Sequence, residues 1–339
     1  MNLPPTSLCT DDIRELCSSS LIWDAHAGIF PAPDADLQGV TSWRDHLVDY
    51  VSINIGFDLL DWETSLRTLL SYRRKIGLMS DSVQIIRSVG DILKARAEGK
   101  LAVSFDIEGV NALNGDVTMV SVYYDLGVRQ MLLAYNLNNL GGGGCHDIDN
   151  GLSAFGRQVI AEMNRVGMIV DASHVGLRTS LEMMEHSESP VVFSHSNPTV
   201  LCKHQRNITD EQIRACASQG GVVGINGMGI FLGDNITTDN VYADHACYVA
   251  ELVGPEHVAI GLDWKPPMKS APDLGSILRS RPDYWPVGQR YDTAGIKIVS
   301  PAQIPSICTI LASRGWTRYD LEGLLGRNFF SLAQRIWKG

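Results

Sequence analysis

Imidazole and carboxylate side chains stand at the ends of several short apolar runs in this sequence. His26 ends the run SLIWDAH, His174 ends GMIVDASH and His195 ends PVVFSH. Glu108 and Asp263 stand at the ends of two further runs, LAVSFDIEG and HVAIGLD. Imidazole and carboxylate groups suit Zn²⁺ as ligands, and one carboxylate can bridge two ions. If the ends of these runs meet in space, they predict a zinc site with a carboxylate available as a base.

These runs are short, rich in β-branched and aliphatic residues, and alternate with segments of helical periodicity. Their nearly continuous apolarity is typical of strands buried on both faces, as in a parallel barrel. The eight candidate strands are residues 20–26, 50–56, 101–109, 128–135, 167–174, 190–195, 220–226 and 257–263. We therefore predict a single α/β domain over residues 1–339, a (β/α)₈ barrel of the triosephosphate isomerase type with its core at about 20–335. An open doubly wound sheet is the alternative, although no strand is followed by GxGxxG.

The segments between and after these strands complete the prediction. We expect amphipathic helices at residues 80–99, 153–166, 209–219 and 317–338. Four consecutive glycines, Gly141–Gly144, predict a loop over residues 136–152, and the Pro- and Trp-rich residues 264–300 predict a long loop or lid. In a barrel of this type, functional residues lie at the carboxyl ends of strands and in the loops that follow.

Each candidate residue also has a structural interpretation. His26 could be a hydrogen-bonded core histidine, His174 a helix cap and His195 a turn residue. Glu108 could pair with an arginine, and Asp263 could cap a turn. Because one fold places all five at the same barrel mouth, the metal-binding interpretation is favoured for the set.

Composition excludes several classes of protein. Hydrophobic residues make up 45% of the 339 residues, enough for a large core, and the net charge of −10 disfavours binding to nucleic acid or to anionic membrane surfaces. No run approaches the roughly 18 apolar residues of a membrane helix. Seven cysteines without a CxxC pair, and a start that does not have the pattern of a signal peptide, predict a cytoplasmic protein.

Several longer segments together resemble the renal (membrane) dipeptidase family of metallopeptidases, within the amidohydrolase superfamily. The most specific are GLSAFGRQVIAEMNRVGMIVDASHVG (151–176) and PVVFSHSNPTVLCKHQRNITD (190–210). DIEGVNAL (106–113), YDLGVRQMLLAYN (124–136) and LLGRNFFSLAQRIW (324–337) match in pattern and in order.

The resemblance implies a barrel with two zinc ions, hydrolysis of dipeptides and a homodimer. It places Glu108 on the bridging carboxylate, His174 and His195 on ligands of the second zinc, and His26 on a ligand of the first. It places Asp263 on the aspartate that handles the proton and Arg206 on the arginine that holds the substrate carboxylate.

The sequence departs from the family pattern at three places. The family has His-x-Asp at the end of strand one, whereas this chain has His26-Ala27-Gly28, so the first zinc site loses a carboxylate. A family histidine that contacts the developing oxyanion is replaced by Tyr135, whose phenol can donate a similar hydrogen bond. The run Gly141–Gly144 also differs from the family.

These departures leave three functional hypotheses. The first is a zinc-dependent hydrolase of dipeptides or related carboxylate-bearing amides, with one or two zinc ions per chain. The second is a single-zinc amidohydrolase that acts on a non-peptide or cyclic amide. The third is a binding protein without activity.

Overall fold

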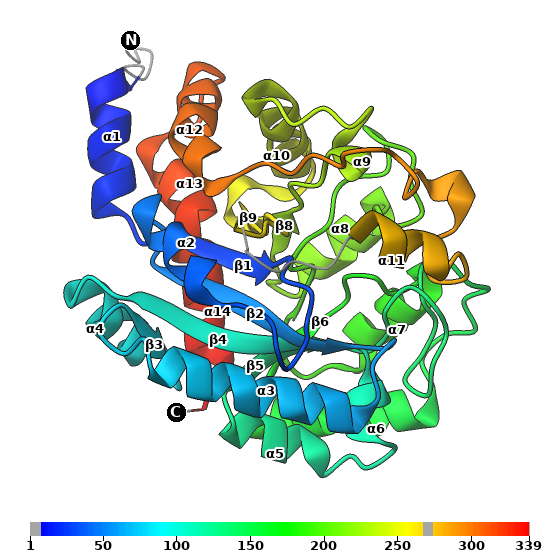
Figure 1. Cartoon of the computed structure of the whole chain (residues 1–339). Coiled ribbons are helices and arrows are strands. Elements are labelled where there is room, and N and C mark those ends of the chain that lie inside the picture. Colours follow the sequence, from blue (N-terminus) through cyan, green and yellow to red (C-terminus); the bar gives the residue numbers. More distant parts are fainter. Residues whose placement is uncertain (1–7, 267–273, 339) are drawn as a thin grey trace.

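Eight parallel strands form a barrel in the computed structural model, which describes residues 8–266 and 274–338 (Figure 1). Hydrogen bonding joins the strands in the order β7-β6-β5-β4-β2-β1-β9-β8, and a parallel bridge between Phe193 and Val223 closes the barrel from β7 to β8. The strands are β1 (Trp23–Ala27), β2 (Tyr50–Phe57), β4 (Leu101–Glu108), β5 (Val128–Leu132), β6 (Ile169–Asp171), β7 (Val191–Val192), β8 (Val223–Ile225) and β9 (Val258–Ile260). The predicted α/β barrel and its eight strands are confirmed.

A ninth strand corrects one prediction. Residues 80–99 do not form one helix: β3 (Val83–Ile85) pairs in parallel with Leu101–Val103 of β4, and helix α4 (Val89–Ala97) begins only after Ser88. The physical reason is the capping box of Ser88 and Asp91, which starts a helix at that point and leaves the preceding residues free to extend. β5 pairs with β4 only from Phe105 onward, so the first residues of β4 have an edge available to β3.

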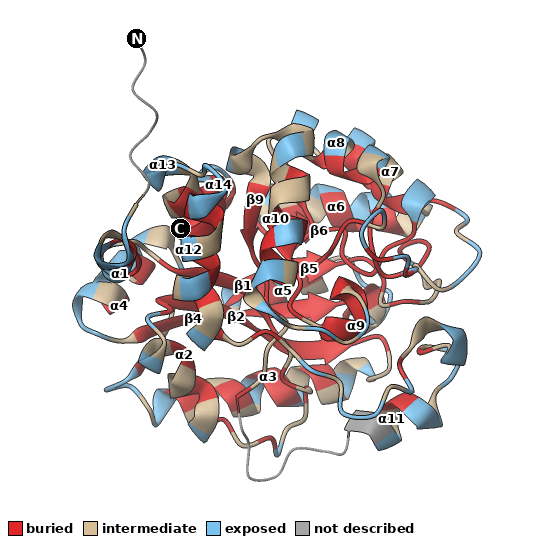
Figure 2. Cartoon of the chain, turned by 90° about the horizontal axis from the view of Figure 1, so that it is seen from above, coloured by how far each residue is buried: buried red, intermediate tan, exposed pale blue. Residues whose placement is uncertain are grey.

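Helices surround the barrel and present one face to it (Figures 1 and 2). They are α1 (Thr10–Ser19), α2 (Ser42–Asp45), α3 (Trp62–Gly77), α5 (Met119–Asp125), α6 (Ala154–Val166), α7 (Leu177–His186), α8 (Asp210–Ser218), α9 (Gly229–Leu232), α10 (Asp239–Val253), α11 (Leu274–Ser280), α12 (Ile304–Ser313), α13 (Arg318–Glu322) and α14 (Asn328–Ile336). The predicted helices at 153–166 and 209–219 correspond to α6 and α8, and the capping box of Thr209 and Gln212 is present at the start of α8. Within the expected loop 264–300, α11 and a short 3₁₀ turn at Val287–Gln289 are helical, and residues 267–273 lie outside the described part.

The core fills the barrel and the layer between its outer wall and the helices. Every residue of the eight barrel strands is buried, whereas most of the helices combine buried and exposed positions (Figure 2). Two glycines let the backbone after β7 enter the barrel closely, because a Cβ at Gly224 or Gly261 would overlap with the carbonyl oxygen of Ser194. The next residue along the chain is His195, which is buried.

No helix in the described part of the chain has the length and apolarity needed to cross a bilayer.

Candidate metal centre

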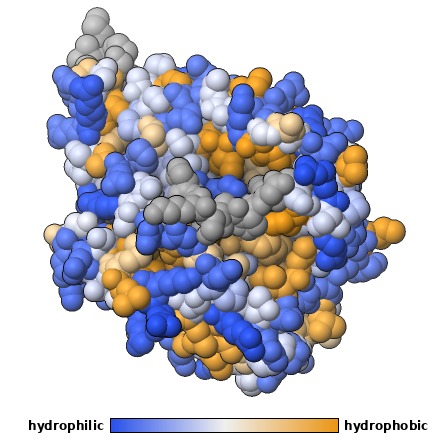
Figure 3. All heavy atoms as spheres, viewed as in Figure 1, coloured by the Kyte–Doolittle hydropathy of each residue, from blue (hydrophilic) through white to orange (hydrophobic). Residues whose placement is uncertain are grey.

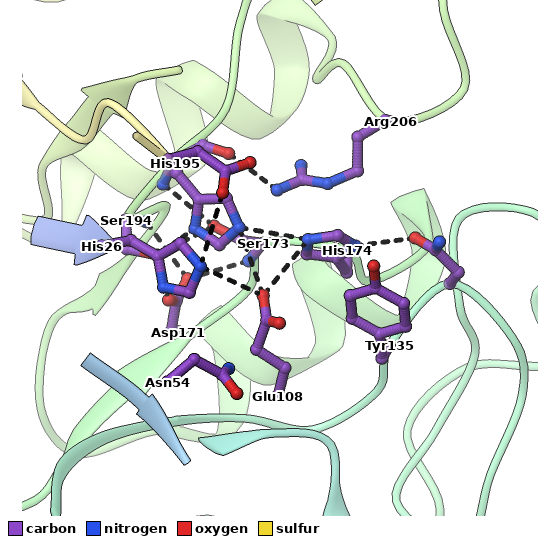
Figure 4. A network of polar contacts seen from close by, with 12 residues as sticks. His26, Asn54, Glu108, Tyr135, Asp171, Ser173, His174, Ser194, His195 and Arg206 are labelled. Carbon is purple, nitrogen blue, oxygen red and sulfur yellow. Dashed lines mark hydrogen bonds and ion pairs between the residues drawn. The ribbon is translucent and has the colours of Figure 1, made fainter. Parts of the chain in front are cut away.

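The carboxyl ends of the barrel strands bring the predicted metal ligands together (Figure 4). His26 lies on β1 and Glu108 ends β4, while His174 and His195 follow β6 and β7. The Nε2 atoms of His174 and His195 each lie 3.3 Å from Glu108 Oε1 and 3.1 Å from one another. His26 Nε2 lies 3.7 Å from the same oxygen, and its ring stacks on His195 with centroids 4.0 Å apart. All four predicted ligands therefore surround one point.

The proton positions on His174 follow from its hydrogen bonds. The Asn136 amide nitrogen donates to the carbonyl of Tyr284 at 2.9 Å, which directs its oxygen to His174 Nδ1 at 2.7 Å. Because an amide oxygen only accepts, His174 Nδ1 carries the proton. In the neutral ring Nε2 is then a bare acceptor that faces the centre.

Hydrogen bonds also fix the proton position on His195. Ser194 donates its hydroxyl proton to the buried carboxylate of Asp171, so its oxygen accepts from His195 Nδ1 at 2.6 Å. His195 Nε2 is therefore also an acceptor. In metal sites, a ligating imidazole typically donates its other ring N–H to an oxygen that fixes the tautomer and the orientation of the ring.

When Glu108 is ionised, these contacts bring three electron pairs to one point without a proton between them. Glu108 Oε1 is buried and has no hydrogen-bond partner among residues 8–266 and 274–338. Acceptors placed this closely repel one another unless a cation lies among them. Three imidazoles and a carboxylate form a donor set that suits Zn²⁺, so the residues present fit the metal that the sequence predicts. One ligand atom each from His26, Glu108 and His195 lie within 4.8 Å of one another.

Electrostatics support a cation at this point. Burial raises the pKa of Glu108 to about 8, together with the nearby carboxylates of Asp106 and Asp263 and against the effect of His26. Burial alone would lower the pKa of His26, but Asp106, Glu108 and Asp263 outweigh it and raise that pKa to about 10. Glu108 therefore keeps its negative charge at neutral pH only when a positive partner, such as protonated His26 or a metal cation, lies beside it.

Backbone strain marks the same residues. Asn136, His174 and Asp263 have φ angles of +63°, +64° and +54°, in the left-handed region that favours glycine. Such conformations cost free energy and persist where the surrounding structure holds them, often at functional sites. Here the strain falls on one ligand candidate, on its hydrogen-bond partner and on the predicted base.

Asp263 lies at the edge of the centre. Its Oδ1 is 3.8 Å from His26 Nε2, and its Oδ2 accepts a hydrogen bond from the Asn226 side chain at 3.2 Å. Gly28 packs against this residue so closely that a Cβ would overlap with the Asp263 carbonyl and lie 2.5 Å from its Oδ1. The chain therefore has neither a carboxylate at position 28 nor room for one in this backbone arrangement.

Tyr135 and Arg206, the two predicted substrate contacts, lie in different surroundings. Tyr135 stacks on His174 at 4.3 Å, and its hydroxyl oxygen accepts from Trp285 Nε1 at 3.2 Å, which leaves its proton free to donate. Arg206 is almost fully buried and donates to the Ser196 hydroxyl at 3.0 Å and to the His195 carbonyl at 2.7 Å. Its Nε has no partner within the described ranges.

A chamber of about 580 Å³ opens above the centre. Its floor includes His26, Glu108, His174 and Asp263, and its walls include Phe30, Phe57, Tyr135, Phe231, Leu278 and Trp285. We call this space the chamber. Arg206 is not among the described residues that line it.

Sequence reasoning missed several residues that support the site: Asn136, Ser194, Asn226 and Asp58. Asp58 directly follows β2, and its buried carboxylate accepts from the backbone N–H groups of Tyr135 at 2.9 Å and Asn111 at 3.1 Å, and from Asn139 Nδ2 at 2.7 Å. Burial raises the pKa of Asp58 to about 7. Its place at a strand end is the signal that could have identified it.

A closed parallel barrel with imidazoles and a carboxylate gathered at its mouth defines the metal-dependent hydrolases of the amidohydrolase type. A crystal structure of an amidohydrolase from Pseudomonas aeruginosa is similar over 96% of this chain and 99% of that one, with a TM-score of 0.85 and 28% identity. Residues 48–278 match the model of the membrane dipeptidase family, peptidase family M19. The chain belongs to this family and is a hydrolase of the metallopeptidase type.

Two relatives agree with this assignment. A protein of Schizosaccharomyces pombe described as an uncharacterized dipeptidase is 32% identical over 277 residues, which are 78% of this chain and 60% of that protein. The dipeptidase verJ of Clonostachys rogersoniana is 30% identical over 321 residues, 93% of this chain and 72% of the relative. The chain thus spans about three fifths of the yeast relative and a larger share of the second.

Proposed function

We propose that this chain is a zinc-dependent hydrolase of dipeptides or of related amides that carry a carboxylate. The observation that carries the proposal is the convergence of His174 Nε2, His195 Nε2 and Glu108 Oε1, three acceptors within 3.3 Å of one another. A bound zinc ion polarises a carbonyl and makes water a nucleophile near neutral pH.

The other residues have roles that follow from their positions. Asp263, held by Asn226, accepts a proton from the attacking water and delivers it to the leaving amine. Tyr135 lines the chamber beside His174 and donates its free hydroxyl proton to the developing oxyanion. Arg206 is the candidate clamp for the substrate carboxylate, because its Nε is unpaired and guanidinium binds carboxylates in a planar geometry. Arg206 is buried and does not line the chamber, so this role requires its side chain to move toward the substrate.

We further propose that zinc binds tightly at His174, His195 and Glu108, and weakly or not at all at the His26 side. Gly28 supports this because it supplies no ligand and because a Cβ at this position would overlap with Asp263. The same observation favours the second candidate, a single-zinc amidohydrolase acting on a cyclic or non-peptide amide.

Zinc content and a substrate panel test the proposal together. Protein purified without chelator should contain between about one and two zinc per chain, measured by mass spectrometry, and should hydrolyse dipeptides of either stereochemistry at the carboxyl-side residue. Zinc near one per chain with turnover of lactams alone would select the second candidate. Absence of zinc, or zinc without turnover of any amide, would contradict both.

A further inference from the structure

The walls of the chamber differ chemically from its floor, and this difference limits what the site accepts. Polar groups gather at the floor, where Asn54, Glu108 and the histidines lie. The walls are built from aromatic and aliphatic side chains, and among the described lining residues away from the floor the charged ones are Asp34 and Lys265. Figure 3 shows apolar side chains gathered on both sides of the grey atoms near the middle of the face drawn in Figure 1.

One wall is a continuous series of aromatic rings that begins at the metal centre. Tyr135 stacks on His174, and the ring of Phe57 meets Tyr135 edge-on at 5.1 Å. Phe30 then meets Phe57 edge-on at 5.2 Å. A substrate bound at the centre would have this wall beside it.

Other elements supply the remaining walls. Met228 and Phe231 come from the segment after β8, Leu278 from α11, and Ile296 and Ile298 from the segment before α12. Phe57, Phe231 and Leu278 belong to one apolar cluster that is separate from the barrel core. The cluster therefore does not complete the barrel core, and it borders the chamber instead.

We infer that the enzyme selects dipeptides in which at least one residue carries a large apolar side chain, and that Phe30 and Phe57 form the surface that recognises it. This inference rests on the proposed function and specifies its substrate class. A dipeptide of two alanines leaves most of the 580 Å³ chamber and its apolar walls unused. A charged side chain against the aromatic part of these walls would lose its hydration, and among the described lining residues away from the floor Asp34 and Lys265 alone offer it an opposite charge.

Two substrate series test the inference. We would measure kcat/KM for X-Ala and Ala-X dipeptides with X as Ala, Leu, Phe, Lys and Glu. At one position at least, Phe should exceed Ala about tenfold or more, mainly through KM, while Lys and Glu fall to the level of Ala or below. Equal rates for Ala and Phe at both positions, or a preference for the charged residues, would overturn the inference.

Variants of Phe30 test whether this residue belongs to the surface that recognises the apolar side chain. Phe30 is half-buried in a loop, so we expect its variants to fold. Phe30→Ala should reduce the Phe-to-Ala ratio several-fold, and Phe30→Glu should move the preference toward Lys. Leu78→Ala, at a residue that is 80% exposed and does not line the chamber, is the matched control and should keep the wild-type ratio. An unchanged ratio in both Phe30 variants would contradict the assignment.

Calorimetry separates this inference from the proposed function. Binding of Phe-Phe and of Ala-Ala to the His195→Ala variant measures the chamber without turnover, and tighter binding of Phe-Phe is the expected result. Selective binding without hydrolysis by the wild type would refute the proposed function and support the chamber assignment. Hydrolysis by the wild type without tighter binding of Phe-Phe would support the proposed function and refute the chamber assignment.

Discussion

The half of the centre formed by His174 and His195 is held more firmly than the half formed by His26. Asn136 and Ser194 each occupy one ring nitrogen of the first two histidines and fix the other as an acceptor. His26 Nδ1 lies 3.3 Å from Asp106 Oδ1, an ion-pair contact that is longer than the hydrogen bonds of the other two rings. The fold therefore orients the imidazoles of His174 and His195 for an ion and constrains that of His26 more weakly.

Replacement of His195 should give the largest effect. His195→Ala removes a bare acceptor from the firmly held half, and loss of a Lewis acid costs several kcal/mol of transition-state stabilisation. That cost corresponds to about a thousandfold decrease in kcat/KM. Zinc content should fall in parallel. An active variant with full zinc content would remove the basis of the metal assignment.

Replacement of His26 should have a smaller effect, which makes it the direct test of the comparison. His26→Ala should retain the more tightly bound zinc and lose between about ten- and a hundredfold in activity, as expected for a group that tunes a metal site. Mass spectrometry of the purified variant measures the zinc. If His26→Ala and His195→Ala lose equal amounts of zinc, the two halves are equivalent and the comparison is wrong.

Replacement of Asn136 tests whether hydrogen bonds hold His174 and His195 in their orientations. Asn136→Ala leaves His174 in place but frees its Nδ1, so the ring can rotate and exchange its proton position. Zinc affinity should fall about ten- to a hundredfold, measured by competition with a chromophoric chelator. Unchanged affinity would show that packing against Tyr135 alone orients the ring.

The sequence predicted the barrel and the convergence of its candidate ligands, because both follow from the periodicity of the strands. Strands buried on two faces produce the apolar runs, and parallel strands bring their ends to one mouth, so His26, Glu108, His174 and His195 could be grouped without coordinates. The error at residues 80–99 arose because a three-residue strand produces no period that distinguishes it from the start of a helix.

Features that depend on contacts between distant loops could not be predicted in this way. The role of Asn136 depends on the carbonyl of Tyr284, which is 148 residues away and decides the direction of the amide. The burial of Arg206 beneath His195 likewise follows from tertiary packing and has no local sequence signal. Asp58 is intermediate, since its place after β2 could be seen but its three donors could not.

Gly28 gives the smallest predicted effect. From the sequence, Gly28→Asp would be expected to restore the family ligand and raise zinc content. The structure changes this expectation, because any Cβ at position 28 meets the carbonyl of Asp263. Relief of that overlap requires β1 and the segment after β9 to separate, so Gly28→Ala and Gly28→Asp should each lose about 1–3 kcal/mol of unfolding free energy.

Chemical denaturation measures the loss, with Gly77→Ala as the matched control. Gly77 lies in α3 with nothing within 4 Å of an added Cβ, so alanine there should leave stability unchanged or raise it slightly. If Gly28→Asp instead keeps wild-type stability and takes up a second zinc, the backbones of β1 and of the segment after β9 can move apart without cost. The weaker half of the centre would then lack only a ligand, because space for one could be made.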